Sequence, residues 1–495
     1  SATGRRPLRQ RRGRGRAMTD LRAGVQGRPP LDGRLEPWMS ELLADAGGCA
    51  ALVDRFGSPV NLIHPATMGR NAKQLVEAGR RAGVEIGLFF ARKANKALTL
   101  VDEIVRLGHG VDVAGEAELQ QTLQRGVPGR RIILTAAIKP ERLLRLAVAS
   151  GVTISLDSAP EAAAVAALAA ELGTIAQVAP RLAPETGQGL PPTRFGAPSA
   201  AWSEVLAPGF GLAVTGVHFH LHGYRAADRA AMLAEAIGLV GRLREQGHRP
   251  EFVDIGGGVP ISYLDDGEQW RAFWAAHGAS ATRGDEQITW KNAELRSVYP
   301  FHQQPVRGDW LSELLAAPLG SGTVATALQA AGLRLHLEPG RALVDGCGLT
   351  LARVSFVKRR SDGVGLVGVE MNRTQCRSTS DDFLVDPILV RSTPSGPPWD
   401  GFLVGAYCIE DELILLRRMH FPHGVAPGDL IGLVNTGGYL MHILESASHQ
   451  IPLARNVVCE RGGYEPDPID HWTSDSGSAV RPSPTVQHPH ASSSS

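Results

Sequence analysis

The chain lacks the features that mark several large classes of protein. None of its apolar runs approaches the roughly 20 residues that a membrane-spanning helix needs. The formal net charge is only +1, so no overall field attracts the chain to nucleic acid or to a charged membrane surface. The five cysteines are widely spaced and form no Cys-x-x-Cys pair, which favours reduced thiols in a cytoplasmic protein over a disulfide framework.

Lysine is also scarce, with six lysines against 45 arginines. Two of the six, Lys93 and Lys96, lie where an apolar run over residues 84–91 meets a helical pattern that begins at Ala94. A desolvated lysine amine can form an imine with a carbonyl compound, whereas the arginine guanidinium stays protonated and cannot. Lys93 is therefore a candidate for Schiff-base chemistry. The alternative is a solvated lysine at the end of a strand.

The two ends have compositions that do not bury enough apolar surface to fold. Residues 1–17 hold seven arginines and no acid. They are sequence upstream of a start at Met18, a solvated tail, or an arginine-rich transit peptide. From Glu465 onward the chain is rich in Ser, Pro and His and ends in four serines. We predict disordered tails over residues 1–36 and 465–495.

A regular alternation of strand-like and helical patterns fills the middle of the chain. Several of the helical segments end at glycine, which is a common helix stop. The eight apolar runs cover residues 84–91, 110–114, 131–135, 152–156, 175–182, 213–220, 251–255 and 333–338. Eight strand–helix units predict an α/β fold, a (β/α)8 TIM barrel over residues 64–340. A doubly wound open sheet, the alternative, would need fewer strands.

The pattern changes after Arg341. Six strand-like runs follow with few helices between them, at residues 349–357, 365–370, 402–407, 413–418, 430–434 and 451–457. They predict a separate C-terminal β domain over residues 341–464. Residues 37–63 precede the first barrel helix, and we expect them to join this β domain and to add a strand to it.

One segment of the barrel region is unusually long and aromatic. Between the seventh and eighth strands, residues 261–319 contain four of the eight tryptophans. This loop would leave the C-terminal end of a strand, which is the active-site face of a barrel, and loops of this length are usually functional. We expect this insert to shape the substrate pocket. A docked subdomain or an oligomer contact is the alternative.

Two motifs at predicted strand ends suit the binding of a phosphate group. Gly256-Gly257-Gly258 follows the seventh strand, and three glycines let backbone N–H groups approach an anion closely, although a glycine triplet is more often a turn. Glu338-Pro339-Gly340-Arg341 ends the eighth strand, and loops at these two positions of such barrels often bind phosphate. Arg341 is thus a candidate clamp. Glu338 is a candidate partner for a ring nitrogen, or else a capping or ion-paired carboxylate.

Three histidines alternate at the end of the sixth strand. His218, His220 and His222 have a period of two, which places their imidazoles on one face of a strand. A zinc site is one interpretation, but no fourth ligand has an evident motif. We favour a histidine that stacks or donates a hydrogen bond, and we predict no metal.

Taken together, Lys93, the His220 strand, the glycine triplet and the Glu-Pro-Gly-Arg run resemble the fold-type III pyridoxal-phosphate decarboxylases. These are the diaminopimelate, ornithine and arginine decarboxylase relatives of alanine racemase. The similarity spans about residues 45–460, and the motifs occur in the order of the family. The resemblance implies pyridoxal 5′-phosphate as the cofactor, an amino acid as the substrate, and a homodimer with shared active sites.

The resemblance also assigns cofactor-binding roles. Lys93 matches the lysine that holds the cofactor as an imine, His220 the histidine stacked on its ring, and Glu338 the acid paired with its ring nitrogen. The remaining matches are Gly256, Gly257, Gly258 and Arg341 in the phosphate cradle, Tyr439 at the phosphate, Arg181 near the cofactor and, less specifically, Asp112.

Cys408 matches the cysteine that the neighbouring subunit presents to the substrate, where it helps to protonate the carbon that has lost carbon dioxide. The acid that usually follows this cysteine, and that binds a distal substrate amine, is replaced by Ile409, so we expect a substrate other than diaminopimelate.

Glu338 favours decarboxylation, because a protonated ring is the stronger electron sink and alanine racemases place an arginine there. A racemase or epimerase and a non-catalytic, cofactor-binding regulatory relative are the alternatives.

Overall fold

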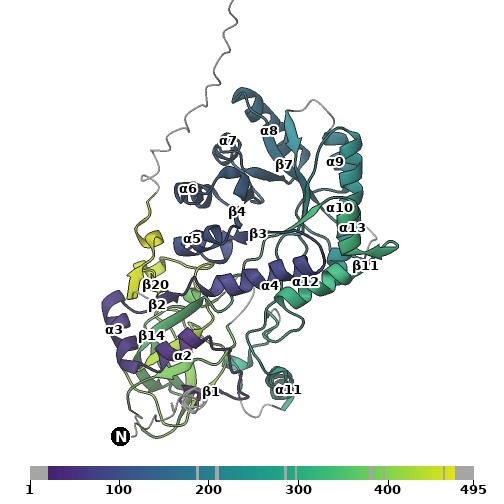
Figure 1. The fold of residues 1–495 in the computed structure, drawn as a ribbon. Coiled ribbons are helices and arrows are strands. Elements are labelled where there is room, and N and C mark those ends of the chain that lie inside the picture. The colour runs from purple at the N-terminus through teal and green to yellow at the C-terminus, as the bar shows by residue number, and fades with distance from the viewer. Residues whose placement is uncertain are drawn as a thin grey trace, which may run out of the picture.

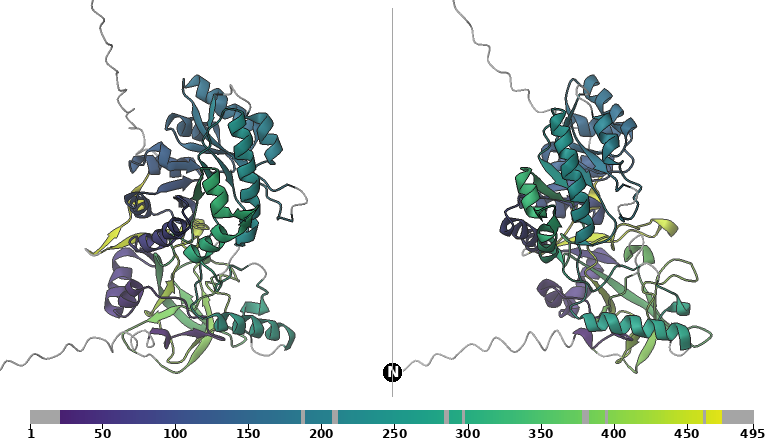
Figure 2. Two further views of the ribbon diagram at one scale, coloured as in Figure 1. Left: turned by 45° about the vertical axis from the view of Figure 1, so that its right-hand side comes forward. Right: turned by 90° about the vertical axis from the view of Figure 1, so that its right-hand side faces the viewer.

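The computed structural model describes residues 21–185, 189–206, 211–283, 287–295, 298–377, 383–393, 396–460 and 463–473. Over this part of the chain, two units lie one above the other in the views of Figure 1 and Figure 2: a barrel surrounded by helices, and a second unit built mainly of strands. None of the described helices is both long and apolar enough to cross a membrane.

The barrel is closed and its strands are parallel. They follow the order β3 (Ile86–Ala91), β4 (Gly110–Val113), β5 (Ile132–Leu134), β6 (Thr153–Leu156), β7 (Ala176–Leu182), β9 (Gly216–Phe219), β10 (Phe252–Asp254) and β13 (Arg334–Leu337), which pairs again with β3. β8 (Leu212–Val214) lies just before β9 and also pairs with β7. These positions coincide with the eight predicted runs, so the predicted barrel is confirmed.

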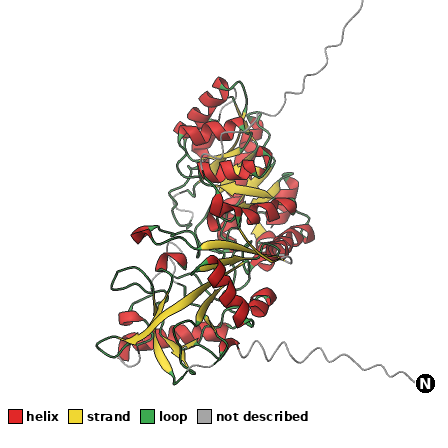
Figure 3. Ribbon diagram, turned by 90° about the vertical axis from the view of Figure 1, so that its left-hand side faces the viewer, coloured by secondary structure: helices red, strands yellow, loops and turns green. Residues whose placement is uncertain are grey.

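Helices cover the outside of the barrel (Figure 3). They are α4 (Thr67–Arg81), α5 (Leu98–Arg106), α6 (Glu116–Gln124), α7 (Glu141–Ala149), α8 (Ala159–Glu171), α9 (Ser199–Val205), α10 (Ala226–Glu245), α12 (Arg307–Ala316) and α13 (Val324–Ala330). The helix predicted to begin at Ala94 begins four residues later, because η1 (Arg92–Ala94) is a short 3-10 helix and Asn95 is extended. That irregular segment carries Lys93.

The second unit is a β domain that takes strands from both sides of the barrel in the sequence. Its sheet follows the order β1 (Gln26–Gly27), β18 (Met419–Phe421), β17 (Trp399–Val404), β15 (Gly365–Val369), β14 (Gly348–Arg359), β2 (Val60–Ile63), β20 (Arg455–Glu460) and β21 (Gly463–Pro466). β19 (Leu430–Val434) also pairs with β14 and carries β16 (Ile388–Val390). β2 comes from the segment before the barrel, after α2 (Pro37–Leu43) and α3 (Ala46–Phe56), and lies between β14 and β20.

One predicted strand of the β domain is wrong. Residues 413–418 form only isolated bridges, from Leu413 to Val404 and from Arg417 to Thr289. Leu413, Ile414 and Leu415 are each buried, so the apolar run reflects burial without strand pairing. β16 and β18 were not predicted, because three residues are too few to display an alternation.

Both predicted tails are partly ordered, which corrects their boundaries. Within the tail predicted over residues 1–36, β1 pairs with β18 and Leu31 is fully buried. Within the tail predicted from residue 465, Asp467 is buried and accepts hydrogen bonds from the backbone N–H groups of Leu98 and Thr99 at the start of α5. Composition missed these segments because their partners lie hundreds of residues away. Residues 1–20 and 474–495 lie outside the described residues.

The aromatic insert divides between the two units. α11 (Gly267–Arg283) lies beside the β domain (Figure 1), where the guanidinium of Arg417 lies 5.1 Å from the ring centre of Phe273. Trp290, in η3 (Trp290–Asn292), packs edge-on against Phe402 of β17. α12, in contrast, packs on α4 and α10 as a helix of the barrel wall. Much of the insert therefore packs against the β domain and connects it to the barrel.

We predict that the segment around β1 contributes strongly to stability through one buried ion pair. Asp386 pairs with Arg417, and it also accepts hydrogen bonds from the N–H groups of Gly27 (2.9 Å) and Leu31 (3.1 Å). Asp386→Ala leaves the Arg417 charge buried without its partner, so the free energy of unfolding should fall by about 3–5 kcal/mol. Chemical denaturation measures this loss.

The control is Glu77→Ala, which removes an exposed ion pair with Lys73 on α4. Exposed pairs contribute little, so its unfolding midpoint should stay close to that of the wild type. Equal effects of the two substitutions would contradict a structural role for the Asp386 pair.

Candidate active site

Lys93 lies at the C-terminal end of β3, and its amine points to the next strand of the barrel. Nζ of Lys93 is 2.9 Å from a carboxylate oxygen of Asp112 on β4, and the other oxygen of Asp112 accepts a hydrogen bond from Thr135 at 2.5 Å. Burial alone lowers the pKa of Lys93, but the negative charge of Asp112 and its neighbours outweighs burial and raises it. The Lys93 side chain remains 43% exposed, so a small molecule can reach the amine.

The backbone around Lys93 is fixed on both sides. The buried guanidinium of Arg92 donates to the side chain of Gln121 (2.8 Å) and to the carbonyl of Lys96 (2.7 Å). On the other side, the side chain of Asn95 donates to the Gly437 carbonyl at 2.9 Å. These contacts hold the irregular turn and join it to the β domain.

Three buried side chains form a layer inside the barrel at the same end. Glu338 follows β13, Asp254 ends β10 and His218 lies on β9. One carboxylate oxygen or ring nitrogen from each of the three side chains lies within 4.8 Å of the other two. Burial, followed by the charge of the neighbouring carboxylate, raises the pKa of Glu338, and burial likewise raises that of Asp254. A metal ion also takes such donors, but the positive charges of Lys93 and Arg181 beside them oppose the binding of another cation.

Arg181 connects four strands of the barrel from within. Its guanidinium binds Asp157 (3.0 Å) after β6, the carbonyl of Thr135 (2.7 Å) after β5, and Nδ1 of His218 (3.2 Å) on β9. The side chain is almost completely buried. Arg181 therefore positions its neighbours through these three hydrogen bonds.

The other two histidines of the alternating series have different surroundings. Nδ1 of His220 accepts a hydrogen bond from the N–H of Gly257 at 3.3 Å. Burial, followed by the charge of Lys93, lowers the pKa of His220 to about 3, so its ring is neutral at physiological pH. His222 is exposed, beyond the end of β9. The three imidazoles thus do not form one site.

The glycine triplet follows β10 and is shaped by close neighbours. Gly258 has a φ of 81°, and a Cβ there would lie 2.1 Å from the guanidinium of Arg229. Arg229 is fully buried and donates to the carbonyl of Gly223 at 2.7 Å and, at longer distances, to those of Leu221 and Gly257. One arginine of α10 therefore holds the loop after β9 against the glycine turn.

Arg341 is surrounded by tyrosines. Its guanidinium donates to the hydroxyl of Tyr263 (2.7 Å), and its carbon lies 4.1 Å from the ring centre of Tyr299 and 5.2 Å from that of Tyr439. Tyr263 and Tyr299 belong to the aromatic insert, whereas Tyr439 comes from the β domain, where its N–H donates to the carbonyl of Ala94. The insert thus reaches the site by positioning a cation.

Cys408 lies in the β domain, in the loop after β17. Its side chain is exposed and its N–H donates to His449 at 3.3 Å. His449 in turn stacks on Tyr407, with ring centres 4.8 Å apart. Among the contacts of the described residues, no hydrogen bond or ion pair joins Cys408 to the group around Lys93 in the same chain.

Sequence reasoning missed several residues of this site. Arg229 carried a signal, because it stands among Ala226, Ala230 and Leu233 on the buried stripe of α10, where an unpaired arginine would be costly. Tyr263 and Tyr299 carried none, since nothing in the spacing of the insert indicates which of its aromatic residues face Arg341.

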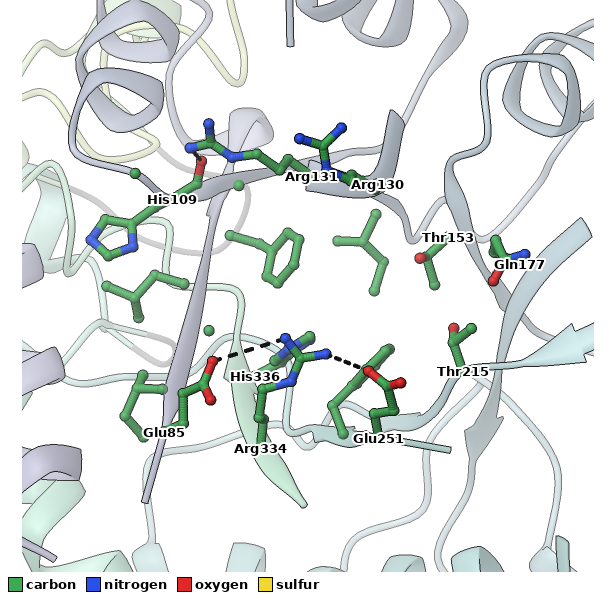
Figure 4. A pocket seen from close by; sticks show the side chains of 18 of the residues that line it. Glu85, His109, Arg130, Arg131, Thr153, Gln177, Thr215, Glu251, Arg334 and His336 are labelled. Carbon is green, nitrogen blue, oxygen red and sulfur yellow. Dashed lines mark hydrogen bonds and ion pairs between the residues drawn. The ribbon is translucent and has the colours of Figure 1, made fainter. Parts of the chain in front are cut away.

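A separate cavity of about 440 Å³ opens at the opposite, N-terminal end of the barrel strands (Figure 4). Its rim carries Arg130 and Arg131 on one side and, across from them, Arg334 between Glu85 and Glu251. None of the predicted site residues lines it. This cavity therefore belongs to the foot of the barrel and not to the Lys93 site.

A layer of rings separates the cavity from that site. His336 stacks on Phe252 with ring centres 4.0 Å apart and lies 4.9 Å from Phe89. Two glycines leave room for these rings. A Cβ at Gly87 would lie 2.4 Å from His336, and a Cβ at Gly216 would lie 2.3 Å from Phe252. His336 and Phe252 each precede a carboxylate of the buried layer by two residues, so the rings lie directly beneath it.

Comparison with known proteins gives a consistent result. The family described as pyridoxal-dependent decarboxylase, pyridoxal binding domain, matches residues 69–285. A Sinorhizobium fredii protein whose function is uncharacterised is 34% identical over 424 residues, which cover 83% of this chain and 90% of that protein. The diaminopimelate decarboxylase of Pseudomonas aeruginosa is 25% identical, over 81% of this chain and 87% of that enzyme.

Solved structures share the fold at lower identity. The crystal structure of diaminopimelate decarboxylase from Methanocaldococcus jannaschii superposes with a TM-score of 0.65 at 20% identity, and covers 84% of this chain and 90% of that one. That of a Vibrio vulnificus lysine/ornithine decarboxylase complexed with putrescine gives a TM-score of 0.63 at 18% identity, with coverages of 86% and 99%. Both place a barrel and a β domain in the same arrangement.

We predict that the glycine turn after β10 does not tolerate a side chain. Gly258→Ala forces a methyl group against Arg229 and places alanine in a left-handed conformation, which alone costs about 1–2 kcal/mol. The midpoint of thermal unfolding should therefore fall. Gly241→Ala is the control, since Gly241 lies in α10 with open space around it. There alanine should raise the midpoint, because it favours the helix, and a fall of similar size would contradict the argument.

Proposed function

This chain belongs to the pyridoxal-dependent decarboxylase family, and we propose that it removes carbon dioxide from the α-carbon of an amino acid, with Lys93 joined to pyridoxal 5′-phosphate. The observation that carries the proposal is the placement of Lys93 and Glu338 at one end of one barrel. The first offers an accessible amine, and the second a buried carboxylate oxygen without a hydrogen-bond partner among the described residues. The family uses this cofactor, and the assignment of individual residues is our proposal.

The residues at the site fit the cofactor. The unpartnered Oε1 of Glu338 suits the N–H of a protonated pyridine ring, and the neutral ring of His220 suits a stacked position. Arg341 and the N–H of Gly258 offer a cation and a backbone donor for a phosphate, whereas the N–H groups of Gly256 and Gly257 donate to Asp254 and His220. Tyr439 adds a hydroxyl there, since a Cβ at Gly340 would lie 2.4 Å from it.

Each side chain has a distinct task in this proposal. Bound pyridoxal phosphate supplies an electron sink for the charge left on the α-carbon when carbon dioxide leaves. Glu338 holds a proton at the ring nitrogen. Asp112 orients the Lys93 amine through their 2.9 Å hydrogen bond, and Arg181 orients the wall between Asp157 and His218.

Cys408 is proposed to act on the site of a partner subunit. Its thiol is exposed, and no hydrogen bond or ion pair among the described residues joins it to the Lys93 group of its own chain; both observations support a shared site in a homodimer, as the family resemblance implies. There the thiol would deliver a proton to the α-carbon. A racemase, an epimerase and a non-catalytic relative are the competing functions, and none of them accounts for Lys93, Glu338 and Cys408 together.

The loop after Cys408 supports a substrate with a less cationic side chain than diaminopimelate. Ile409 is 44% exposed in the place of the usual acid. Of the acids that follow, Asp411 is bound by Lys291 and by the indole N–H of Trp290, and Glu412 is bound by the backbone of Arg373. Asp411 and Glu412 are therefore engaged by neighbouring residues, whereas Glu410, the acid directly after Ile409, is exposed. The proposal of a less cationic substrate thus depends on Ile409.

The first test measures carbon dioxide and product chirality across a panel of amino acids, together with the visible absorption of the purified protein. Wild-type protein should release carbon dioxide from at least one amino acid. Lys93→Ala should lose both the release and the visible band, because its methyl group cannot bond to the cofactor. Lys73→Ala, on the exposed face of α4, should keep both. Inverted chirality without carbon dioxide would favour the racemase alternative.

The second test asks whether two subunits share a site. Lys93→Ala and Cys408→Ala proteins, each inactive alone, should regain part of the wild-type activity when mixed, because a hybrid dimer contains one intact site. Subunit exchange is verified independently with labelled chains. Failure to recover activity despite exchange would exclude a site completed by the Cys408 of a partner.

A further inference from the structure

His218 has a defined protonation state, set by two donors. Its Nδ1 accepts a hydrogen bond from Nε of Arg181 at 3.2 Å and lies 2.6 Å from the hydroxyl of Ser155. An arginine nitrogen can only donate, so Nδ1 of His218 must carry a lone pair. Since the pKa of this buried imidazole lies well below its ordinary value, the ring is neutral and its single proton resides on Nε2.

That proton faces the carboxylate of Glu338. Nε2 of His218 is 3.5 Å from Oε1 of Glu338, and both side chains are almost completely buried. Neither atom has a hydrogen-bond partner among the described residues. An N–H donor and a carboxylate oxygen thus approach one another, while the Glu338 carboxyl also shares a hydrogen bond with the side chain of Asp254.

Glu338 needs such a donor because its other neighbours favour the protonated acid. Asp254 adjoins Glu338, Asp112 lies nearby, and burial opposes a charge on each of them. Lys93 and Arg181 are the cations that counter this effect. A Glu338 that had taken up a proton would no longer stabilise a protonated ring nitrogen.

We propose that His218 is a positioning residue that keeps Glu338 ionised and aimed at the cofactor ring, with Arg181 and Ser155 fixing the tautomer that makes it a donor. The inference rests on the proposed function, because it assigns Glu338 to the ring nitrogen. It extends that function to a chain of contacts from Arg181 through His218 to Glu338, which spans β7, β9 and β13.

The test uses the cofactor-loaded protein without substrate. In His218→Asn the amide oxygen replaces Nδ1 as acceptor for Arg181 and Ser155, but no N–H reaches Glu338; in His218→Gln an N–H extends to about the Nε2 position. His336→Phe is the matched control, since His336 is another buried, neutral histidine of the barrel, and its ring stacks on Phe252 without a hydrogen bond or ion pair to a carboxylate among the described residues. The readout is the pH midpoint of the visible absorption band.

We expect the midpoint to rise by at least about half a pH unit in His218→Asn. Without the donor, Glu338 takes up a proton and the ring nitrogen loses its positive charge, so the nitrogen that joins Lys93 to the cofactor keeps its own proton to higher pH. His218→Gln should restore most of the wild-type midpoint, and His336→Phe should leave it unchanged. In turnover, His218→Asn should lower kcat by about tenfold or more and change KM little, since it alters the electron sink and not the substrate contacts.

An unchanged midpoint in His218→Asn would overturn the inference, as would an equal rise in His336→Phe. If His218→Asn does not fold, His218→Phe carries the same expectation and the same refutation. A failure of the His218 inference can be told apart from a failure of the proposed function. Wild-type protein with a Lys93-dependent band but no carbon dioxide release would overturn decarboxylation and leave the midpoint comparison valid. Absence of the band would overturn both.

Discussion

The cost of burying negative charge governs the architecture of this site. Asp112, Asp254 and Glu338 lie inside one end of the barrel and are almost fully removed from water, where an isolated carboxylate would take up a proton. Nearby cations and hydrogen-bond donors offset that cost. Lys93 binds Asp112, Arg181 donates to His218, and the backbone N–H of Gly256 donates to Asp254. These contacts offset part of the cost of holding three carboxylates in one buried layer.

The barrel alone does not complete the site. Tyr439, from the β domain, meets the turn that carries Lys93, and Asp467, near the end of the described chain, caps α5 directly after that turn. The aromatic insert adds Tyr263 and Tyr299 around Arg341. Three segments that are distant in sequence therefore fix one lysine and one arginine.

The sequence predicted those features that depend on local periodicity or on a residue type with one chemical use. The barrel strands followed from apolar runs bounded by glycine, and the sequence correctly placed Lys93 and Glu338 after strands of the barrel, whereas their roles stay predictions. What depended on distant partners was not predicted. β1 is two residues long and exists only because β18 lies beside it, and the run over 413–418 is buried without being a strand.

The same distinction holds within the site. The role of Arg229 was not predicted, because the pattern of a helix does not by itself select one arginine. The signal was its position on the buried stripe of α10, among alanine and leucine residues. The insert was expected to shape the substrate pocket, and that expectation stays a prediction. Its contacts are with Arg341, with the β domain and, through α12, with the barrel wall, which no spacing rule could have indicated.

The stack of Phe89, His336 and Phe252 lies between the cavity at the foot of the barrel and the buried carboxylates. A side chain added at Gly87 would meet His336, and because protein interiors are closely packed, the displaced ring would press on the layer next to it. The two ends of the barrel are therefore mechanically coupled, although the foot cavity and the Lys93 site share no lining residue.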